Sequence, residues 1–348
     1  MLLPTPTEAA PAEPRPHRRI VAMVVGLVIS ALLLWWAARG LRITDVLHHV
    51  RTAPLAPVLL SVIVSTLVFP IRMLRWRILL IPAAEGPIGV RPAWHAVAIG
   101  FMANNLLPLR AGEVLRAWAV SRLAPIRWSS AFASVAVERV FDALTVVGLL
   151  VAALLAGSLP PGVRIAGLPA DTLAWRVGLI GLAGLLVAGV VLANTAPAAA
   201  LIRKLVPFQG IAERLVALLD GVRAGVAALR SPGRLAAIVA WSLAVWGVNA
   251  LSFLLLFPAF GVPGNLSAAL VLQAAIVFGV AVPSSPGYVG VFEAAIVLTL
   301  GLYGVPQDRA LAYALTYHVT TFAPIILLGL YSLTRTPLHW RDVREHTR

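Results

Sequence analysis

The stretch NNLLPLRAGEVLR, residues 104–116, decides the fold class that we expect. It breaks an apolar run at Pro108, sets Arg110 and Glu113 on either side of Gly112, and then resumes as an apolar helix. A proline removes a backbone donor and clashes with the preceding helical turn. Within hydrocarbon the freed carbonyls need partners in the protein or a water-filled cavity, and a charge costs about 2.5–3.5 kcal/mol or more. The stretch is therefore typical of a broken helix at a functional site inside a membrane.

The composition of the whole chain predicts an all-α polytopic membrane protein. The chain has 348 residues, of which 60% are hydrophobic and 12% charged, and its mean hydropathy is +0.90. A soluble domain carries about a quarter charged residues. The absence of cysteine excludes a disulfide framework and a thiolate metal site. A net charge of +14 would suggest a nucleic-acid partner in a soluble protein, but in a membrane protein it indicates arginine-rich cytoplasmic loops. We expect no nucleic-acid partner, no metal and no cofactor.

Apolar segments of sufficient length predict about six crossings of a bilayer whose core is about 30 Å thick. They are residues 20–38, 54–71, 129–157, 173–193, 235–257 and 310–333. Two further segments, 41–50 and 201–230, carry apolar residues at helical spacing opposite charged ones and predict interfacial helices. We expect a disordered tail at 1–19, one membrane domain at 20–335 with halves 20–157 and 173–333, and a second tail at 336–348.

Two interrupted helical pairs predict an inverted repeat. Residues 93–107 with 113–123, and 266–282 with 291–302, each pass from apolar helix through proline and glycine to a glutamate and a second helix. Most Lys and Arg residues fall on the cytoplasmic side if both termini lie there. That topology makes the pairs re-entrant hairpins that enter from opposite sides, which is typical of inverted repeats with a midplane substrate site. The alternative is two ordinary helical pairs with proline kinks.

The polar residues near the first hairpin suit an anionic ligand. Arg110 lies next to a half-helix N-terminus, where exposed amides favour anions, and its guanidinium can bind a phosphate through two parallel bonds. Alternatively it pairs with Glu113. Glu138, Arg139 and Asp142 lie within one helical turn of each other, so they predict an ion-pair network, either functional or structural, that Arg110 or Arg116 completes. The arginines that close the crossing 54–71 are interpreted as a topology anchor, with head-group contact as the alternative: Arg72, Arg75 and Arg77.

Motifs for enzymatic catalysis are missing from the sequence. It has no H-E-x-x-H, no P-loop and no G-x-G-x-x-G after a strand. Ser284 and Ser285 lie between prolines, but no base lies near them in the sequence. We therefore expect no catalytic residue and a transporter rather than an enzyme.

Four motifs in order resemble the flippase-like integral membrane family that is named for the membrane region of lysylphosphatidylglycerol synthase. They are Arg72-x-x-Arg-Trp-x-x-Leu-Leu, Asn105-x-x-Pro-x-Arg-x-Gly-Glu113, Glu138-Arg-x-x-Asp142 and Pro283-x-x-Pro-Gly-x-x-Gly-x-x-Glu293. The resemblance covers about residues 20 to 335. It implies a bacterial inner-membrane protein that moves, or helps to move, an anionic lipid between leaflets. Full-length synthases also carry a soluble aminoacyltransferase domain; this chain ends at Arg348, so we expect no aminoacyl transfer.

These observations together predict translocation of an anionic phospholipid or a polyprenyl-phosphate-linked lipid through a polar midplane site. The residues expected to contact the substrate are Asn105, Arg110, Glu113, Arg116, Glu138, Arg139, Asp142, Ser284, Ser285, Gly287 and Glu293. Two alternatives remain. One is a membrane-embedded transferase of lipid or glycolipid synthesis, and the other is an accessory subunit that recruits a lipid-synthesis enzyme through residues 201–230.

Overall fold

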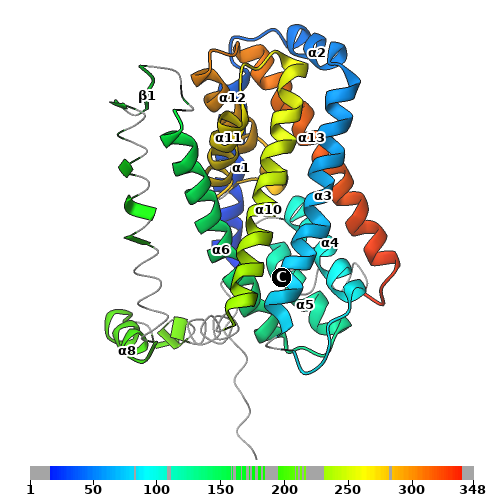
Figure 1. The fold of residues 1–348 in the computed structure, drawn as a ribbon, viewed down its shortest axis with the longest axis vertical. Helices are drawn as coiled ribbons and strands as arrows, with labels where there is room; N and C mark the ends of the chain where they lie inside the picture. The colour runs from blue at the N-terminus through cyan, green and yellow to red at the C-terminus, as the bar shows by residue number, and fades with distance from the viewer. Residues whose placement is uncertain are drawn as a thin grey trace, which may run out of the picture.

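The computed structural model describes residues 16–81, 84–107, 111–157, 195–207, 231–281 and 284–338, and single residues or short groups between 159 and 216. Helices make up most of this part of the chain (Figure 1). In order they are α1 (Pro16–Ala38), α2 (Ile43–Thr52), α3 (Leu55–Leu80), α4 (Val90–Leu106), α5 (Ala111–Leu123), α6 (Trp128–Leu155), α8 (Thr195–Leu205), α10 (Pro232–Leu256), η3 (Phe257–Phe260), α11 (Leu266–Gly279), η4 (Pro286–Tyr288), α12 (Val291–Leu302) and α13 (Gln307–Thr334).

The helices confirm a multi-pass membrane protein. Within the described residues, α3, α10 with η3, and α13 are long and apolar enough to cross a bilayer, and a bent α1–α2 pair makes a fourth candidate. α6 has 28 residues and is also apolar, but the three charges near its centre, Glu138, Arg139 and Asp142, set it apart from these helices. The expected crossing at 173–193 lies largely outside the described residues. The count of six crossings therefore stays a prediction.

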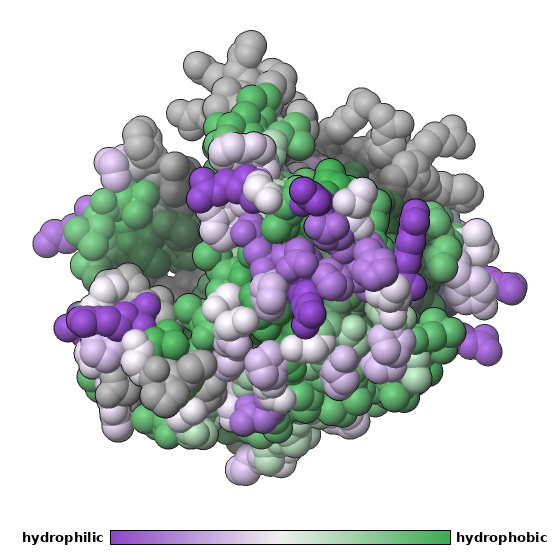
Figure 2. Space-filling view, turned by 90° about the horizontal axis from the view of Figure 1, so that it is seen from above, coloured by the Kyte–Doolittle hydropathy of each residue, from purple (hydrophilic) through white to green (hydrophobic). Residues whose placement is uncertain are grey.

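The outward surfaces of the long helices are apolar. Large side chains such as Leu32, Leu59, Ile63, Leu243 and Leu327 are at least half exposed. Figure 2 shows the end of the molecule that carries α2, where hydrophilic residues gather over the middle of the face and apolar ones flank them. This distribution suits a protein whose sides contact lipid and whose ends contact water.

The first helical pair, α4–α5, returns to the end of the molecule at which it begins. Just before α4 the amide of Glu85 donates to the carbonyl of Pro125, just after α5, at 2.9 Å. The two helices approach closely where both carry glycine, since a Cβ on Gly100 would lie 2.8 Å from the carbonyl oxygen of Gly112. Small residues allow such backbone contact between membrane helices. The pair occupies the lower half of Figure 1.

The second pair, α11–α12, lies in the upper half of Figure 1, and its connecting segment reaches the first pair. A Cβ on Gly287 would lie 3.3 Å from the carbonyl oxygen of Asn105, so the tips of the two pairs are in contact. Helix α1 supports the second tip, because the amide of Ser285 donates to the hydroxyl of Ser30 at 2.8 Å. The two tips therefore meet inside the helical bundle.

Three elements differ from their predictions. α3 continues past residue 71 to Leu80, although Pro70 lies within it. The segment 201–230 is not one helix, because α8 ends at Leu205 before Pro207, and residues 217–230 lie outside the described residues. A small antiparallel pair, β1 (Arg164–Ile165) and β2 (Leu168–Pro169), joins an otherwise helical fold.

An exposed ion pair links the last turn of α8 to the residues after it. Arg203 donates to Glu213 at 2.8 Å, and this hydrogen bond holds the pKa of the Glu213 carboxyl below its usual value. The pair joins the two sides of the break at Pro207.

Candidate functional site

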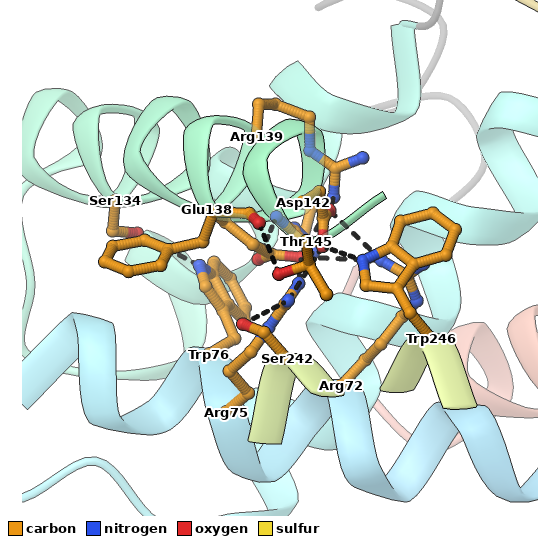
Figure 3. A network of polar contacts seen from close by, with 12 residues as sticks. Arg72, Arg75, Trp76, Ser134, Glu138, Arg139, Asp142, Thr145, Ser242 and Trp246 are labelled. Carbon is orange, nitrogen blue, oxygen red and sulfur yellow. Dashed lines mark hydrogen bonds and ion pairs between the residues drawn. The ribbon is translucent and has the colours of Figure 1, made fainter. Parts of the chain in front are cut away.

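Four helices, α3, α5, α6 and α10, surround a buried group of charged residues (Figure 3). We call this group the arginine cluster, and it consists of Arg72, Arg75, Arg116, Glu138, Arg139 and Asp142. Figure 3 shows arginines from α3 reaching toward the two carboxylates of α6, with Ser242 and Trp246 approaching from α10. Of the six, Arg139 alone has a side chain that is about a third exposed, at 35%.

Glu138 is fully buried and accepts hydrogen bonds from three arginines. Its partners are Arg116 at 2.7 Å, Arg75 at 2.9 Å and Arg139 at 2.9 Å. These arginines come from three different helices, so a single carboxylate joins α3, α5 and α6. A charge in an apolar interior requires such pairing, because an unpaired one is costly.

Asp142 lies one turn further along α6 and extends the cluster to α10. It accepts from the indole of Trp246 at 2.9 Å and pairs with Arg75 at 2.7 Å and Arg139 at 2.9 Å. Arg72 is more distant, at 3.4 Å. Because positions i and i+4 share a helix face, Glu138 and Asp142 both face the cluster.

Neighbouring polar and aromatic side chains hold the arginines in place. Arg75 donates to the hydroxyl of Ser242 at 3.0 Å. The guanidinium of Arg116 lies 4.4 Å from the ring centre of Trp76, and that of Arg72 lies 5.1 Å from Trp246. Such cation–π contacts add stabilisation to charges that are removed from water.

The cluster carries more positive than negative charge among the described residues. Four guanidinium groups face two buried carboxylates and a third one, Glu113, which lies 3.8 Å from Arg139 and is 24% exposed. The Nε atoms of Arg75, Arg116 and Arg139 have no hydrogen-bond partner in the described part of the chain. The described part of the cluster therefore has a net positive charge and three Nε donors without partners there, and its exposed edge lies at Arg139 and Glu113.

The structure brings together part of the set expected from the sequence. Arg116, Glu138, Arg139 and Asp142 form direct contacts, and Glu113 lies at their edge. Arg110 lies outside the described residues, as do Pro108 and Leu109.

Arg72 and Arg75 occupy a different place from the helix end expected of topology anchors. The prediction ended the helix at residue 71, which put them at the membrane surface, whereas α3 carries them into the cluster. Their separation of three positions, on one helix face with Trp76, was the signal in the sequence for an inward-facing site. Arg77 points elsewhere and donates to the carbonyl of Ile88 at 3.0 Å.

The second tip is tied down by its own hydrogen bonds. One carboxylate oxygen of Glu293 accepts from the amide of Gly290 at 2.6 Å, and the other lies 2.5 Å from Nδ1 of His318 on α13. The hydroxyl of Ser285 donates to the carbonyl of Val289. Ser284 and Gly287 contribute backbone contacts to α1 and α4. No contact of Glu293 with a described residue reaches the arginine cluster.

Two asparagines at the first tip have unused polar atoms. Within the described residues, Oδ1 of Asn104 and Nδ2 of Asn105 are buried without a hydrogen-bond partner. Their backbone lies against Gly112 and Gly287. The junction of the tips is therefore polar, and its described residues leave two of these polar atoms without a hydrogen bond.

The sequence model of the family described as the lysylphosphatidylglycerol synthase TM region matches residues 23–329, a range that includes the whole arginine cluster and both tips. The chain belongs to this family. As a member of the lysylphosphatidylglycerol synthase TM family, it is similar to proteins of two archaea. It is 29% identical over 360 residues to "Glycosyltransferase AglD" of Haloferax volcanii, across 92% of this chain and 55% of that protein. It is 27% identical over 319 residues to a "UPF0104 membrane protein" of Methanothermobacter thermautotrophicus, across 87% of this chain and 89% of that protein. The chain thus spans about half the length of AglD.

Proposed function

We propose that this membrane domain binds the phosphate of an anionic lipid at the exposed edge of the arginine cluster and moves the lipid between leaflets. The observation that carries the proposal is the excess of positive charge in a buried cluster that opens at Arg139. Arginine keeps its proton at any physiological pH, and its planar fork matches phosphate oxygens. A phosphate that enters the domain would replace Glu113 as the partner of Arg139, and the other arginines would stay paired.

The order of the helices supports an inverted repeat as the framework for this movement. In each half a long helix is followed by a helical pair and a second long helix, α3–α4–α5–α6 and α10–α11–α12–α13. The two pairs lie at opposite ends of the molecule and their tips meet (Figure 1). With 14 residues, α11 spans about 21 Å, which is less than a bilayer core of about 30 Å. We propose that both pairs are re-entrant and that α6 and residues 173–193 complete six crossings.

The substrate class follows from the charge of the cluster and the setting of the domain. An anionic phospholipid or a polyprenyl-phosphate-linked lipid offers the phosphate that the arginines require. The distribution of Lys and Arg favours cytoplasmic termini in the inner membrane. Lipid-synthesis enzymes would be the natural partners of such a protein, because they supply or use its substrate.

Head-group selectivity in reconstituted vesicles tests the proposal. We expect the protein to accelerate transfer of fluorescently tagged phosphatidylglycerol between leaflets. Dithionite added outside the vesicles reduces only label in the outer leaflet, so transfer is measured as the fraction of label that is reduced in excess of the outer leaflet's share. Tagged phosphatidylcholine should move more slowly, because its own cation is repelled by the net positive charge of the cluster. Equal rates for the two lipids would contradict recognition by charge, and no acceleration of either would contradict translocation.

A second candidate function is glycosyl transfer to a membrane lipid. The similarity to a protein named as a glycosyltransferase favours it. The geometry of the cluster disfavours it, because Glu138 and Asp142 both accept from several arginines and are poorly suited to act as a general base. Mass spectrometry of lipids incubated with the purified protein and a nucleotide sugar distinguishes the two, since only a transferase yields a glycosylated lipid.

A further inference from the structure

A pocket of about 600 Å³ lies between the beginning of α4 and the end of α13, apart from the arginine cluster. Its lining consists of Val90, Arg91, Trp94, His95, Tyr331 and Arg335. The two helices pack closely further along, where Gly329 lies against Met102. The pocket is thus a wedge that opens where the helices diverge.

The lining places the pocket at a membrane surface. α13 is an apolar candidate crossing, and Tyr331 and Arg335 belong to its last turn and its C-terminal cap. Tyr331 is 51% exposed, and Trp94 also lines the pocket. Tryptophan and tyrosine collect at the level of lipid head groups, where their rings contact apolar chains and their polar atoms contact water.

The charge of the lining is positive. Among the residues that the structure describes, Arg91 and Arg335 form no ion pair and no carboxylate lines the pocket. The guanidinium of Arg335 lies 5.2 Å from the ring centre of Tyr331, which leaves its fork free. Nδ1 of His95 is buried and has no hydrogen-bond partner among the described residues. The two guanidinium groups are therefore donors without a carboxylate partner among the described residues, and the imidazole adds an unused polar atom.

We infer that this pocket binds the phosphate-bearing head group of an anionic lipid at the surface of the membrane. Two arginines supply charge and forked donors for the phosphate, and the two aromatic rings contact the first carbons of the lipid. The pocket's volume suits a head group, because ligand pockets span about 300–1,000 Å³. This site is separate from the proposed translocation path, and binding here does not require that translocation occur.

Site-specific photocrosslinking in vesicles tests this inference. A photoreactive phenylalanine analogue at Tyr331 should capture lipid in the pocket, and the same analogue at Leu327, one turn away and 65% exposed, should capture bulk lipid. In vesicles of equal phosphatidylglycerol and phosphatidylcholine, we expect position 331 to enrich phosphatidylglycerol by about tenfold to thirtyfold, because one to two arginine contacts at a membrane surface favour the anionic lipid to this extent. Position 327 should report the composition of the bilayer.

Three variants assign the enrichment to the pocket. The double variant Arg91→Gln with Arg335→Gln should abolish it, whereas Arg234→Gln, an exposed arginine at the beginning of α10, should leave it unchanged. Arg139→Ala should also leave it unchanged, which separates this site from the arginine cluster. Crosslinking at 331 in proportion to bilayer composition would overturn the inference. Persistence of the enrichment in the double variant would also overturn it, because the two arginines would then not be its cause.

Discussion

At the scale of the residue, the arginine cluster depends on Glu138. This carboxylate has no exposure and accepts from arginines on three helices. Removal of one member of a buried ion pair leaves the opposite charge buried without a partner. The resulting loss of folding free energy is larger than the net stabilisation that the pair provides. The residue therefore links the charge of the site to the stability of the fold.

We predict that Glu138→Gln lowers the free energy of unfolding by about 3–5 kcal/mol, because three arginines lose their shared charge. The measurement is thermal unfolding of the purified protein in detergent. The matched control is Glu85→Gln, which breaks the exposed pair with Arg127 and should cost about 0–1 kcal/mol. Similar losses for both variants would contradict the central place of Glu138.

Sequence reasoning found part of this cluster. The spacing of Glu138, Arg139 and Asp142 predicted their contacts, because it places them within one helical turn. The same reasoning ended α3 too early, since arginines at the end of an apolar run are usually at a membrane surface, and so it left Arg72 and Arg75 out. Which helices would bring the arginines together depends on tertiary packing, which one sequence does not reveal.

At the scale of the element, the contact between α12 and α1 depends on Gly290. This glycine has φ of +89°, and a Cβ there would lie 2.8 Å from the carbonyl carbon of Ser30. Its amide also donates to Glu293, which in turn contacts His318 on α13. Gly290 thus allows the second tip to pack against α1, and it is also the N-cap residue of α12.

We predict that Gly290→Ala destabilises the protein by about 2 kcal/mol or more, because the backbone conformation is strained for any other residue and the methyl group overlaps α1. Gly301→Ala on the same helix is the control, since nothing lies within 4 Å of its Cβ position. It should be neutral or stabilising by up to about 1 kcal/mol. Thermal unfolding measures both. A neutral Gly290→Ala would contradict the close packing of the tip on α1.

The predicted helix bounds agree best with the structure where a helix-breaking residue such as glycine flanks the helix. α12 has the predicted bounds, Val291–Leu302, because Gly290 precedes it and Gly304 follows it. α11 begins at its predicted residue, Leu266, and α5 begins at Ala111, two residues before its predicted start. The prediction for 201–230 was wrong as a single helix, because the apolar spacing continues across Pro207 while the helix does not.

At the scale of the whole molecule, the two halves share an order of helices but differ in the chemistry of their polar interiors. The first half contains the charged cluster. The second half contains neutral contacts, such as the one from Asn249 to Gln273 at 3.0 Å and the one between Ser252 and Tyr317 at 2.6 Å, together with the Glu293–His318 pair. If the two halves form an inverted repeat, the binding site for an anion therefore lies in the first half, which carries the charged cluster.

Single cysteines test this topology directly, because the natural chain has none. Ala111→Cys and Ser285→Cys should both react slowly with bulky impermeant reagents, since both residues are half-buried near the contact of the two tips. Small reagents should reach position 111 from the cytoplasmic side and position 285 from the opposite side. Labelling of position 111 from the outside alone would show that α4 and α5 are two full crossings and would contradict the inverted repeat.

The transfer rate of Arg139→Ala tests the central claim, that the arginine cluster recognises the lipid phosphate. Arg139 is the exposed edge of the cluster, and Arg127, the N-cap residue of the same helix, is an exposed arginine outside it. We predict that Arg139→Ala slows phosphatidylglycerol transfer in vesicles by about tenfold to a hundredfold, because a hydrogen bond to a charged group contributes about 1.5–3 kcal/mol. Arg127→Ala should transfer at the natural rate. A folded Arg139→Ala protein that transfers phosphatidylglycerol as fast as Arg127→Ala would contradict the claim.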